Sequence, residues 1–412
     1  MKIKKLLEEF GSPLYVYDNE VLKQRCADMK WFQEKIEEAI AGIRARITYS
    51  TKANNNPVVI KTVQKYGLNV DCMSPFELRV NKECGFTSDQ MLYVCNNIDP
   101  DEMRMVHDNG LLICLDSVSQ VRTWGQLFPC SKIMVRINPG VLGVGHSEKV
   151  VTSGKSTKFG ISESNLGLLY TTAKKYNLKI VGVHQHLGSL FLNDKIPTYI
   201  AGVKAGLEIV KKYFKDVEIV DLGGGFGVPY KPEEQPLDLN LLLDDLVPVL
   251  ADFVQDYPSV KEFKFEPGRY IPCEAGTLFG TVTAVEKRGD TWWVGTDIGM
   301  STLIRPAMYG SYHEISFEYF SDTISEMAPV NICGNICESG DVLGKDRYVT
   351  IPSVGDIVKV HNAGAYGYSM ASNYTGRPRP AEVLIYKGEF STQVKLIRKR
   401  ENLADMMSPI VW

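Results

Sequence analysis

Apolar residues follow two alternating patterns along the first two thirds of the chain. Short runs rich in apolar and β-branched residues predict strands, and longer stretches between them carry apolar residues at helical spacing. The runs that predict strands are 14–17, 46–50, 69–72, 91–94, 111–115, 132–137, 180–184, 219–222 and 262–266. The clearest helical stretches are 75–84, 163–176, 196–214 and 239–253. Strands that alternate regularly with helices indicate parallel βαβ units, and about eight units favour a (β/α)8 barrel over the alternative, a doubly wound sheet.

From about residue 278 the pattern changes to short β-rich segments separated by turns such as Arg288-Gly289-Asp290. These segments are 281–285, 292–295, 315–320, 347–351, 357–361, 381–386 and 392–398. The change predicts a second, mostly antiparallel β-domain of sandwich or barrel type.

Composition places the chain among ordinary globular proteins. Its 412 residues are 44% hydrophobic and 23% charged, and the net charge of −3 offers no electrostatic reason for binding nucleic acid or an anionic membrane. No apolar run is long enough to span a bilayer, and Glu8 and Glu9 interrupt the N-terminal stretch where a signal peptide would be apolar. Nine cysteines without zinc-site spacing predict free thiols, no metal and a cytoplasmic location.

Lys52 follows one of the predicted strands, where the chain enters the polar loop Asn54-Asn55-Asn56-Pro57. Burying a lysine is costly unless its amine has a partner. A lysine at the mouth of a barrel is a candidate Schiff-base nucleophile, because desolvation lowers its pKa and frees the amine. The alternative for Lys52, taken alone, is an ordinary surface lysine.

A glycine-rich run, Gly223-Gly224-Gly225-Phe226-Gly227, follows another predicted strand. Glycines let the backbone approach an anion closely and present several N–H donors to it. The run is neither a Walker A loop nor the dinucleotide-binding G-x-G-x-x-G pattern. It predicts a phosphate cradle on a barrel rim or, alternatively, a tight loop that permits close packing.

Two further strand ends carry polar side chains that suit ligand binding or catalysis. His184 and His186 project to the same face of their strand, and Ser189 follows them. One imidazole suits stacking on a planar ligand and Ser189 suits phosphate, unless the histidines are hydrogen-bonded core residues. In Glu-Pro-Gly-Arg, Glu266 suits a heteroaromatic nitrogen and Arg269 suits a phosphate or carboxylate, unless the two form a surface ion pair.

The lysine, the glycine-rich loop, the histidine and Glu-Pro-Gly-Arg together resemble the fold-type III pyridoxal-phosphate decarboxylases, which are built on an alanine-racemase-like barrel. The resemblance extends over nearly the whole chain, from the segment 10–18 to the segment 377–384. Further motifs that carry it are Gly145-His146, 157–160, 303–310, 337–341 and 364–374. These motifs are most similar to the branch of the family that acts on meso-2,6-diaminopimelate.

The resemblance implies a fold, a cofactor and an assembly. The fold is a (β/α)8 TIM-like barrel at residues 22–272 plus a mostly antiparallel β-domain at 273–412, which also takes in the N-terminal segment 1–21. The cofactor is pyridoxal 5'-phosphate. The expected reaction is decarboxylation of meso-2,6-diaminopimelate to L-lysine and CO2, through an external aldimine and a quinonoid, in a homodimer with shared active sites.

The resemblance also implies a role for each site residue. The cofactor set comprises Lys52 as the Schiff-base lysine, Asp71 near it, His186 on the ring, Glu266 at the ring nitrogen, and Ser189, Gly225, Arg269 and Tyr366 around the phosphate. The substrate set comprises Arg269, Arg305, Tyr309, Glu338 and Tyr366, with the arginines and Tyr309 on the distal carboxylate. Cys337, as a proton donor, and Glu338 would reach into the neighbouring subunit's site, and Lys158 and Asp341 would pair across the dimer interface.

The site residues favour a decarboxylase over its relatives. Loss of CO2 leaves a carbanion that needs an electron sink, and Glu266 keeps the ring nitrogen positive, whereas a related alanine racemase is expected to carry arginine there. Arg305 suits a substrate with a second carboxylate. The alternatives are a decarboxylase of lysine, ornithine or a carboxylated intermediate of siderophore or antibiotic assembly, a regulatory homologue without cofactor, and a lone pyridoxal-phosphate homeostasis barrel.

Two positions depart from the family pattern near the expected substrate pocket. Leu190 stands where glutamine usually follows the His-x-Gly-Ser turn, and Asn335 stands where proline is commoner before the cysteine motif. Because asparagine does not fix φ as proline does, we expect a looser loop around Cys337. For Cys337 the alternative to proton donation is an ordinary buried thiol.

Overall fold

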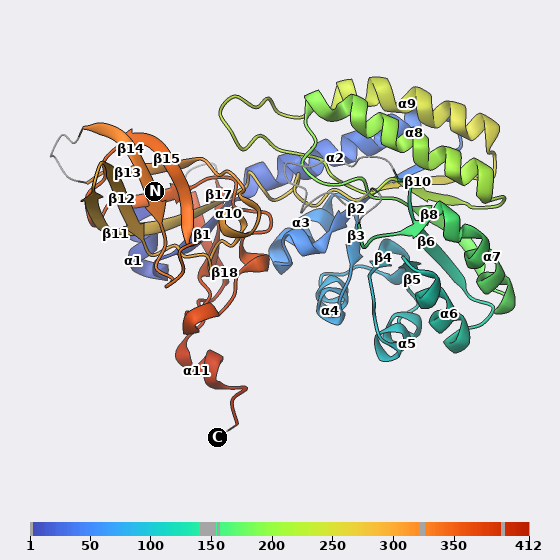
Figure 1. The fold of residues 1–412 in the computed structure, drawn as a ribbon, viewed down its shortest axis with the longest axis horizontal. Coiled ribbons are helices and arrows are strands. Elements are labelled where there is room, and N and C mark those ends of the chain that lie inside the picture. Colours follow the sequence, from blue (N-terminus) through green and yellow to red (C-terminus); the bar gives the residue numbers. More distant parts are fainter. Residues whose placement is uncertain (1–2, 141–153, 155–156, 321–325, 389–391, 412) are drawn as a thin grey trace. The chain divides into compact units, whose positions relative to one another are not determined.

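The computed structural model describes residues 3–140, 154, 157–320, 326–388 and 392–411. These residues form two compact units (Figure 1). Unit 1 comprises Met1–Gln24, Tyr230–Glu234 and Ile271–Trp412, and unit 2 comprises Arg25–Pro229 and Gln235–Tyr270. Within the described ranges, the helices are all too short or too polar to cross a bilayer.

Unit 2 is a closed barrel of eight parallel strands. They are β2 (Arg44–Ser50), β3 (Asn69–Cys72), β4 (Met91–Val94), β5 (Leu112–Leu115), β6 (Lys132–Asn138), β8 (Lys179–His184), β9 (Ile219–Asp221) and β10 (Glu262–Phe265). The hydrogen-bonded order is β5-β4-β3-β2-β10-β9-β8-β6, and pairing of β5 with β6 closes the ring. The short β7 (Ile161–Ser162) adds to β6. The predicted (β/α)8 barrel is therefore confirmed, and the doubly wound alternative is wrong.

Helices surround the barrel strands in Figure 1. They are α2 (Asn19–Ala39), which begins in unit 1, α3 (Pro57–Lys65), α4 (Pro75–Glu83), α5 (Pro100–Asp108), α6 (Val118–Leu127), α7 (Leu166–Lys175), α8 (Ile196–Tyr213) and α9 (Leu239–Asp256). Several begin at a polar residue that caps the helix, followed by proline. Asn56 accepts the Val58 N–H at the start of α3, and Ser74 accepts the Glu77 N–H at the start of α4. Such caps end the preceding loops sharply and keep the strand ends close together.

Unit 1 is a nine-stranded, mostly antiparallel sheet. Its strands are β1 (Leu14–Asp18), β11 (Gly276–Arg288), β12 (Thr291–Thr296), β13 (Ile315–Glu318), β14 (Met327–Cys333), β15 (Val342–Thr350), β16 (Ile357–Val360), β17 (Ala381–Lys387) and β18 (Thr392–Arg398). The order is β15-β14-β12-β11-β1-β17-β18, with β16 joining β13 to β11. The N-terminal β1 pairs antiparallel with β11 and parallel with β17, which confirms that the N-terminal segment belongs to this sheet. Three short helices complete the unit: α1 (Ile3–Phe10), α10 (Arg305–Tyr309) and α11 (Leu403–Met407).

The sequence pattern misses parts of this sheet for local reasons. β14 contains Pro329, which lacks the N–H that a central strand donates, so the pattern predicts no strand there. β11 begins at Gly276 rather than at 281, because glycines interrupt its apolar pattern. A Cβ on Gly280 would lie 2.5 Å from Asp297 Oδ1, so close packing requires glycine at that point.

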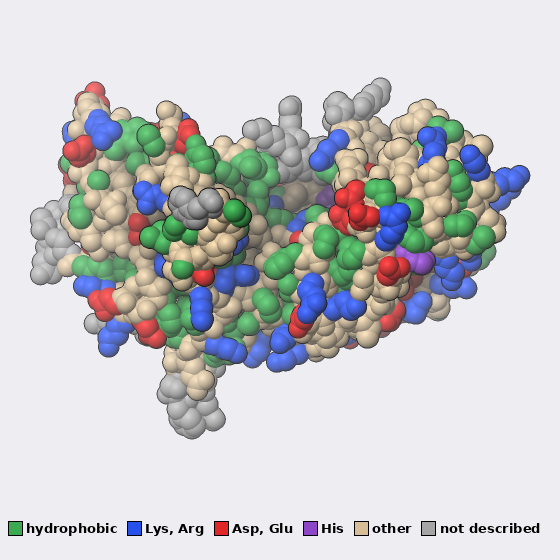
Figure 2. Space-filling model, turned by 90° about the horizontal axis from the view of Figure 1, so that it is seen from below, with side chains coloured by type: hydrophobic (Ala, Val, Ile, Leu, Met, Phe, Trp, Pro, Cys, Tyr) green, Lys and Arg blue, Asp and Glu red, His purple; other side chains and the backbone are tan. Residues whose placement is uncertain are grey.

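The surface carries charges of both signs. Figure 2 shows lysine and arginine side chains interspersed with aspartate and glutamate over the face in view, in keeping with the net charge of −3. The expected domain limits at residues 22 and 272 stay a prediction.

Candidate active site

The carboxyl ends of β2, β3, β8, β9 and β10 carry most of the residues that the sequence predicts for the cofactor. Parallel strands end at the same side of a barrel, so these side chains gather there. Strand register places Ser50 of β2 beside Asp71 of β3, and His184 of β8 beside Asp221 of β9. Of the predicted cofactor residues only Tyr366 belongs to unit 1.

Asp71 holds the backbone on the N-terminal side of Lys52. Its Oδ1 accepts the Thr51 N–H at 3.2 Å, and its Oδ2 accepts the Ser50 hydroxyl at 2.6 Å. The Thr51 hydroxyl in turn donates to the Asp71 carbonyl at 2.6 Å. Lys52 lies in a short 3-10 turn in which Thr51 and Ala53 are buried and Lys52 is exposed. The turn therefore fixes where the lysine side chain begins while leaving its amine accessible.

The Asp71 carboxyl is fully buried, and this changes its protonation. Burial first, and the Glu266 carboxylate second, raise the pKa of Asp71 to about 7 against the opposing effect of the Lys52 ammonium. The neighbouring Glu77 shows the same effect, because burial raises its pKa to about 7. The mouth of the barrel thus holds carboxyl groups that exchange protons near neutral pH.

His186 is held by the glycine-rich loop. The Gly224 N–H donates to His186 Nδ1 at 3.0 Å, so Nδ1 is an acceptor and the ring's hydrogen is on Nε2. Burial lowers the pKa of His186 well below its ordinary value, and Arg136 and Lys52 lower it further. His186 is therefore a neutral ring of fixed orientation, which suits stacking on a planar ligand.

The glycines of this loop have no room for side chains. A Cβ on Gly224 would lie 2.0 Å from the Glu266 carbonyl oxygen, and one on Gly225, where φ is +105°, would lie 2.9 Å from the Gly188 carbonyl oxygen. The loop after β9 is thus packed between the loops that follow β8 and β10. Close packing, one interpretation of the glycine run, is therefore confirmed, and the phosphate cradle stays a prediction.

Glu266 is a buried carboxylate that His184 holds from one side. His184 Nε2 and Glu266 Oε2 are 3.0 Å apart, and both residues are buried. Glu266 Oε1 is buried and has no hydrogen-bond partner among the described residues. The surface ion-pair interpretation of Glu266 and Arg269 is wrong, since both are buried, and Arg269 Nη2 donates to Ser189 Oγ at 3.1 Å.

These features fit pyridoxal phosphate. An orphaned buried carboxylate oxygen, Glu266 Oε1, is a partner for a pyridine nitrogen, and the oriented His186 ring is a partner for its face. The glycine-lined rim next to Ser189 and Arg269 suits a phosphate, and the accessible Lys52 amine suits an aldehyde.

Unit 1 contains an arginine whose surroundings are unusual. Arg305 begins α10 and is 1% exposed. Its Nη1 donates to the Tyr230 hydroxyl at 3.0 Å and to His313 Nε2 at 2.9 Å, and its Nη2 donates to Ser311 Oγ at 3.3 Å. His313 Nδ1 lies 2.8 Å from the His361 carbonyl and donates to it, so Nε2 is an acceptor. In the part of the chain that the structure describes, this buried guanidinium thus has only neutral hydrogen-bond partners, and an anion is the partner it lacks.

The loop that carries Cys337 and Glu338 is exposed but well anchored. Both of these residues are exposed, whereas Asp341 is buried and accepts the Met300 N–H at 2.6 Å and the Ile336 N–H at 2.7 Å. Asn335, at the position where proline is commoner, donates from Nδ2 to the Asp297 carbonyl at 3.2 Å. Side-chain hydrogen bonds therefore take over part of the restraint that a proline ring would supply.

The remaining predicted residues lie as follows. Tyr309 is half-buried at the end of α10, and Glu338 accepts a hydrogen bond from the Tyr374 hydroxyl. Tyr366 is half-buried with φ of +56°, and Leu190 also has a positive φ, of +66°. Lys158 is exposed, so its pairing with Asp341 across a dimer interface stays a prediction. Gly145 and His146 lie outside the described residues.

The sequence analysis does not identify three residues, one at the barrel site and two next to Arg305. Asp221 is buried, and its Oδ1 accepts the Gly223 N–H at 2.9 Å at the entrance to the glycine loop. Its only signal in the sequence is a charged residue inside an otherwise apolar strand. His313 and Tyr230, the partners of Arg305, lie far apart in sequence, and no motif connects them.

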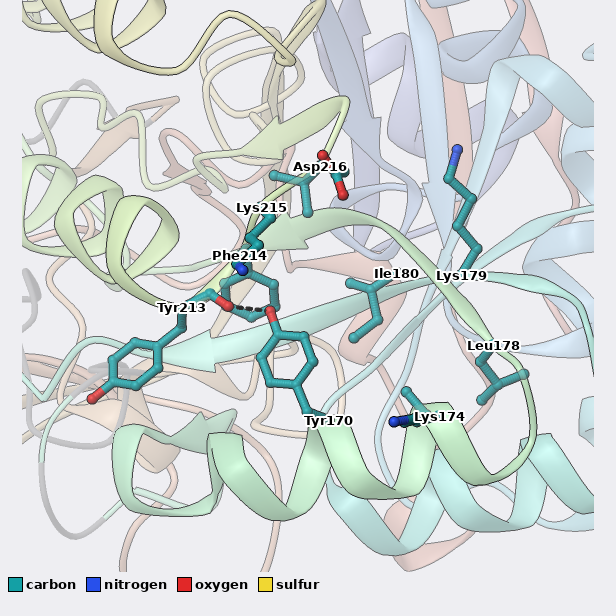
Figure 3. Close-up of a pocket in the computed structure, with 11 residues that line it drawn as sticks. Tyr170, Lys174, Leu178, Lys179, Ile180, Tyr213, Phe214, Lys215 and Asp216 are labelled. Carbon is teal, nitrogen blue, oxygen red and sulfur yellow. Dashed lines mark hydrogen bonds between the residues drawn. The ribbon is translucent and has the colours of Figure 1, made fainter.

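A separate cavity of about 550 Å³ lies beside β8 at the end opposite His184 (Figure 3). Tyr170 and Lys174 of α7 line one side, and the segment that follows α8 lines the other. The Tyr170 hydroxyl donates to the Tyr213 carbonyl across it. The lining contains none of the predicted site residues, so the chemistry lies elsewhere in the barrel.

Comparison with known proteins gives a consistent result. The family model for the pyridoxal binding domain of pyridoxal-dependent decarboxylases matches residues 27–273. A diaminopimelate decarboxylase of Methanothermobacter thermautotrophicus is 35% identical, covering 98% of this chain and 92% of the relative. Another, of Aquifex aeolicus, is 33% identical, covering 99% and 94%. The crystal structure of M. jannaschii diaminopimelate decarboxylase in complex with L-lysine superposes with a TM-score of 0.87 at 30% identity, covering 100% of this chain and 94% of that one.

Proposed function

The chain belongs to the pyridoxal-dependent decarboxylases and, within them, to the diaminopimelate decarboxylases, and from this we propose which of its residues carry out the reaction. The reaction is the decarboxylation of meso-2,6-diaminopimelate to L-lysine and CO2. The cofactor is pyridoxal 5'-phosphate, which supplies an electron sink for the charge left on the carbon that loses CO2.

The barrel residues would hold the cofactor. Lys52 binds it covalently through its amine, and Asp71 keeps the turn that carries Lys52 in place. The neutral His186 ring covers one face of the cofactor. Glu266 keeps the ring nitrogen protonated, and the contacts of this buried carboxylate with His184 support that role.

The cofactor's phosphate would lie on the rim between two loops. Ser189, Arg269 and the backbone at Gly225 would supply donors to it, and the family resemblance adds the Tyr366 hydroxyl. The hydrogen bond from Arg269 to Ser189 supports this assignment, because it brings a cation and a hydroxyl together at that rim.

The environment of Arg305 carries the substrate assignment. A guanidinium that is 1% exposed and bonded only to neutral groups among the described residues favours a carboxylate ligand. Diaminopimelate has such a carboxylate at the end remote from the reacting carbon, whereas lysine and ornithine have an ammonium there. Arg305 and Tyr309 would bind it together with Arg269, and Glu338 would accept a hydrogen bond from the distal amino group.

The thiol of Cys337 would return the proton that the product needs. Its Sγ–H would be the proton donor to the carbon that has lost CO2. The exposed position of Cys337 and Glu338 supports the proposal that both act in the site of a second subunit. The working form is thus a homodimer with shared active sites. We place it in the cytoplasm, which the nine free cysteines support.

The function is tested by supplying the purified protein with pyridoxal phosphate and measuring CO2 release. Parallel reactions contain meso-diaminopimelate, L-lysine or L-ornithine, and products are identified by chromatography. We expect CO2 from diaminopimelate alone, with L-lysine in equal amount. Release from lysine or ornithine but not from diaminopimelate would overturn the substrate assignment and the role of Arg305.

A further inference from the structure

Three buried ionisable side chains lie close together at the carboxyl ends of three neighbouring barrel strands. His184 ends β8, Asp221 ends β9 directly beside it, and Glu266 follows β10. One side-chain nitrogen or oxygen from each lies within 4.8 Å of the others. The exposed fractions are 1% for His184, 0% for Asp221 and 5% for Glu266, so water does not compensate their charges.

Their hydrogen bonds are incomplete in a specific way. His184 Nε2 lies 3.0 Å from Glu266 Oε2, and Asp221 Oδ1 accepts the Gly223 N–H. The remaining atoms, Asp221 Oδ2, Glu266 Oε1 and His184 Nδ1, are buried without a hydrogen-bond partner among the described residues. Two of these atoms are carboxylate oxygens, which repel each other when both groups are ionised and attract when one of them carries a proton.

We propose that Asp221 and His184 are positioning residues for Glu266: Asp221 shares a proton with its carboxyl group, and His184 donates the Nε2 hydrogen to it. The inference rests on the proposed function, in which Glu266 faces the cofactor's ring nitrogen. It adds the groups that keep Glu266 ionised and oriented for that task.

The surrounding charges place the shared proton mainly on Asp221. Burial first, and the Glu266 carboxylate second, raise the pKa of Asp221 to about 7, while His184 and Lys264 oppose the shift. Burial also raises the pKa of Glu266, but the Lys52 and Arg136 charges lower it. Lys52 and Arg136 therefore stabilise the negative charge of Glu266, whereas the main charge that acts on Asp221 is the Glu266 carboxylate, opposed by the weaker effect of Lys264.

His184 is neutral in this arrangement. Burial first, with Arg136 and Lys52, lowers the pKa of His184 to about 3, while Asp221 and Asp116 oppose the shift. A neutral imidazole that donates from Nε2 carries no hydrogen on Nδ1. His184 thus contributes one directed donor without neutralising Glu266, so the negative charge remains available to the cofactor.

Conservative and disruptive variants separate this role from packing. Asp221→Asn keeps a donor toward Glu266 and an acceptor for the Gly223 N–H, whereas Asp221→Ala removes both. His184→Gln keeps an N–H donor, whereas His184→Leu does not. Tyr199→Phe is the matched control, because Tyr199 is buried near Asp221 but its hydroxyl has no hydrogen-bond partner among the described residues.

The measurement needs no substrate. Apo-protein is titrated with pyridoxal phosphate to obtain Kd, and the absorption of the bound cofactor is followed against pH. We expect Asp221→Asn, His184→Gln and Tyr199→Phe to bind within about threefold of wild type, and Asp221→Ala and His184→Leu to bind about ten- to a hundredfold more weakly. In these two variants the midpoint of the absorption change should move to higher pH by about one unit or more, since an uncharged ring nitrogen withdraws less electron density.

Three results would overturn the proposal: an unchanged Kd and absorption midpoint in Asp221→Ala, equal losses in Asp221→Ala and Asp221→Asn, or the same losses in Tyr199→Phe. Circular dichroism of the apo-proteins identifies variants that fail to fold. If the Asp221 variants fail to fold, the comparison of His184→Gln with His184→Leu tests the positioning role.

Glu266→Gln separates the positioning role of Asp221 and His184 from the proposed role of Glu266 itself. If it leaves Kd and the absorption midpoint unchanged, the role of Glu266 in the proposed function fails; if it changes both while Asp221→Ala and His184→Leu do not, only the positioning role fails.

Discussion

Among single residues, Asp71 gives the cofactor-free protein a pH-dependent stability. Burial first, and the Glu266 carboxylate second, raise its pKa from 3.8 to about 7. The folded chain therefore binds a proton that the unfolded chain releases, and the free energy of unfolding falls as pH rises from about 4 to about 7. Above this window both states are ionised and the contribution no longer changes.

Asp71→Asn should reduce this dependence. We expect the thermal midpoint of the apo-protein to fall less between about pH 5 and about pH 7.5 in the variant than in wild type. Glu77 and Asp221 shift in the same direction, so part of the slope remains. Asp101→Asn, at a side chain that is 93% exposed, is the control and should leave the slope unchanged. Parallel wild-type and Asp71→Asn curves would contradict the assignment.

Arg305 should act on substrate binding. Arg305→Met removes a charge-assisted contact to the distal carboxylate, so we expect KM for meso-diaminopimelate to rise about ten- to a hundredfold. Arg305→Lys, which keeps the charge but not the planar fork, should give a smaller rise. Steady-state kinetics measure both, and Arg347→Met, an arginine stacked on Tyr312, is the control. An unchanged KM in Arg305→Met would rule out this role.

Among single residues, the sequence identifies site candidates that directly follow a strand, because parallel strands end at one side of a barrel and bring these side chains together. Lys52, His186 and Glu266 were found in that way, and the family resemblance supplied their roles. Asp221 could not be found, since it gathers with His184 and Glu266 only in the folded barrel. His313 lies only eight residues after Arg305, but no motif marks it as the partner of that arginine. A buried polar side chain has no sequence signature until its partner is known.

Among the elements, the loop after β9 determines how closely the strand ends approach. Gly224→Ala would place a methyl group 2.0 Å from the Glu266 carbonyl and should displace the loop. We expect the apo-protein to bind pyridoxal phosphate at least about tenfold more weakly, because the His186–Gly224 hydrogen bond and the rim change together.

Gly167→Ala is the matched control, since nothing lies within 4 Å of its added Cβ on α7. Alanine in a helix should stabilise this protein by about 1 kcal/mol and leave the cofactor's Kd unchanged. Equal affinities in Gly224→Ala and wild type would contradict the packing argument.

Helices and strands of the barrel could be predicted because their apolar patterns are regular. The β-domain was harder, since its strands depend on partners rather than on local pattern. β14 contains proline and β11 contains two glycines, and tertiary pairing overrides both signals. The limits of these two strands depend on their pairing in the sheet and not on their own sequences.

At the scale of the whole molecule, shared sites have a distinctive consequence. Lys52→Ala and Cys337→Ala should each be nearly inactive alone. If Cys337 serves the partner's site, mixed dimers of the two variants contain one intact site. Random assembly from equal amounts should then restore about a quarter of wild-type activity.

The test is CO2 release by the co-expressed variants, compared with the two proteins mixed after separate purification. Restoration on co-expression supports the shared site. Its absence in a preparation that sedimentation shows to contain mixed dimers would mean that Cys337 serves its own subunit.

We infer that the carboxyl end of the barrel carries the cofactor, with Lys52 at its centre. Reducing the cofactor-loaded protein with borohydride fixes any imine, and peptide mass spectrometry then locates the modified lysine. We expect one pyridoxyl group per chain, on the peptide that contains Lys52, and none in Lys52→Ala. A label on a different lysine, or no label on a protein that releases CO2 from diaminopimelate, would contradict it.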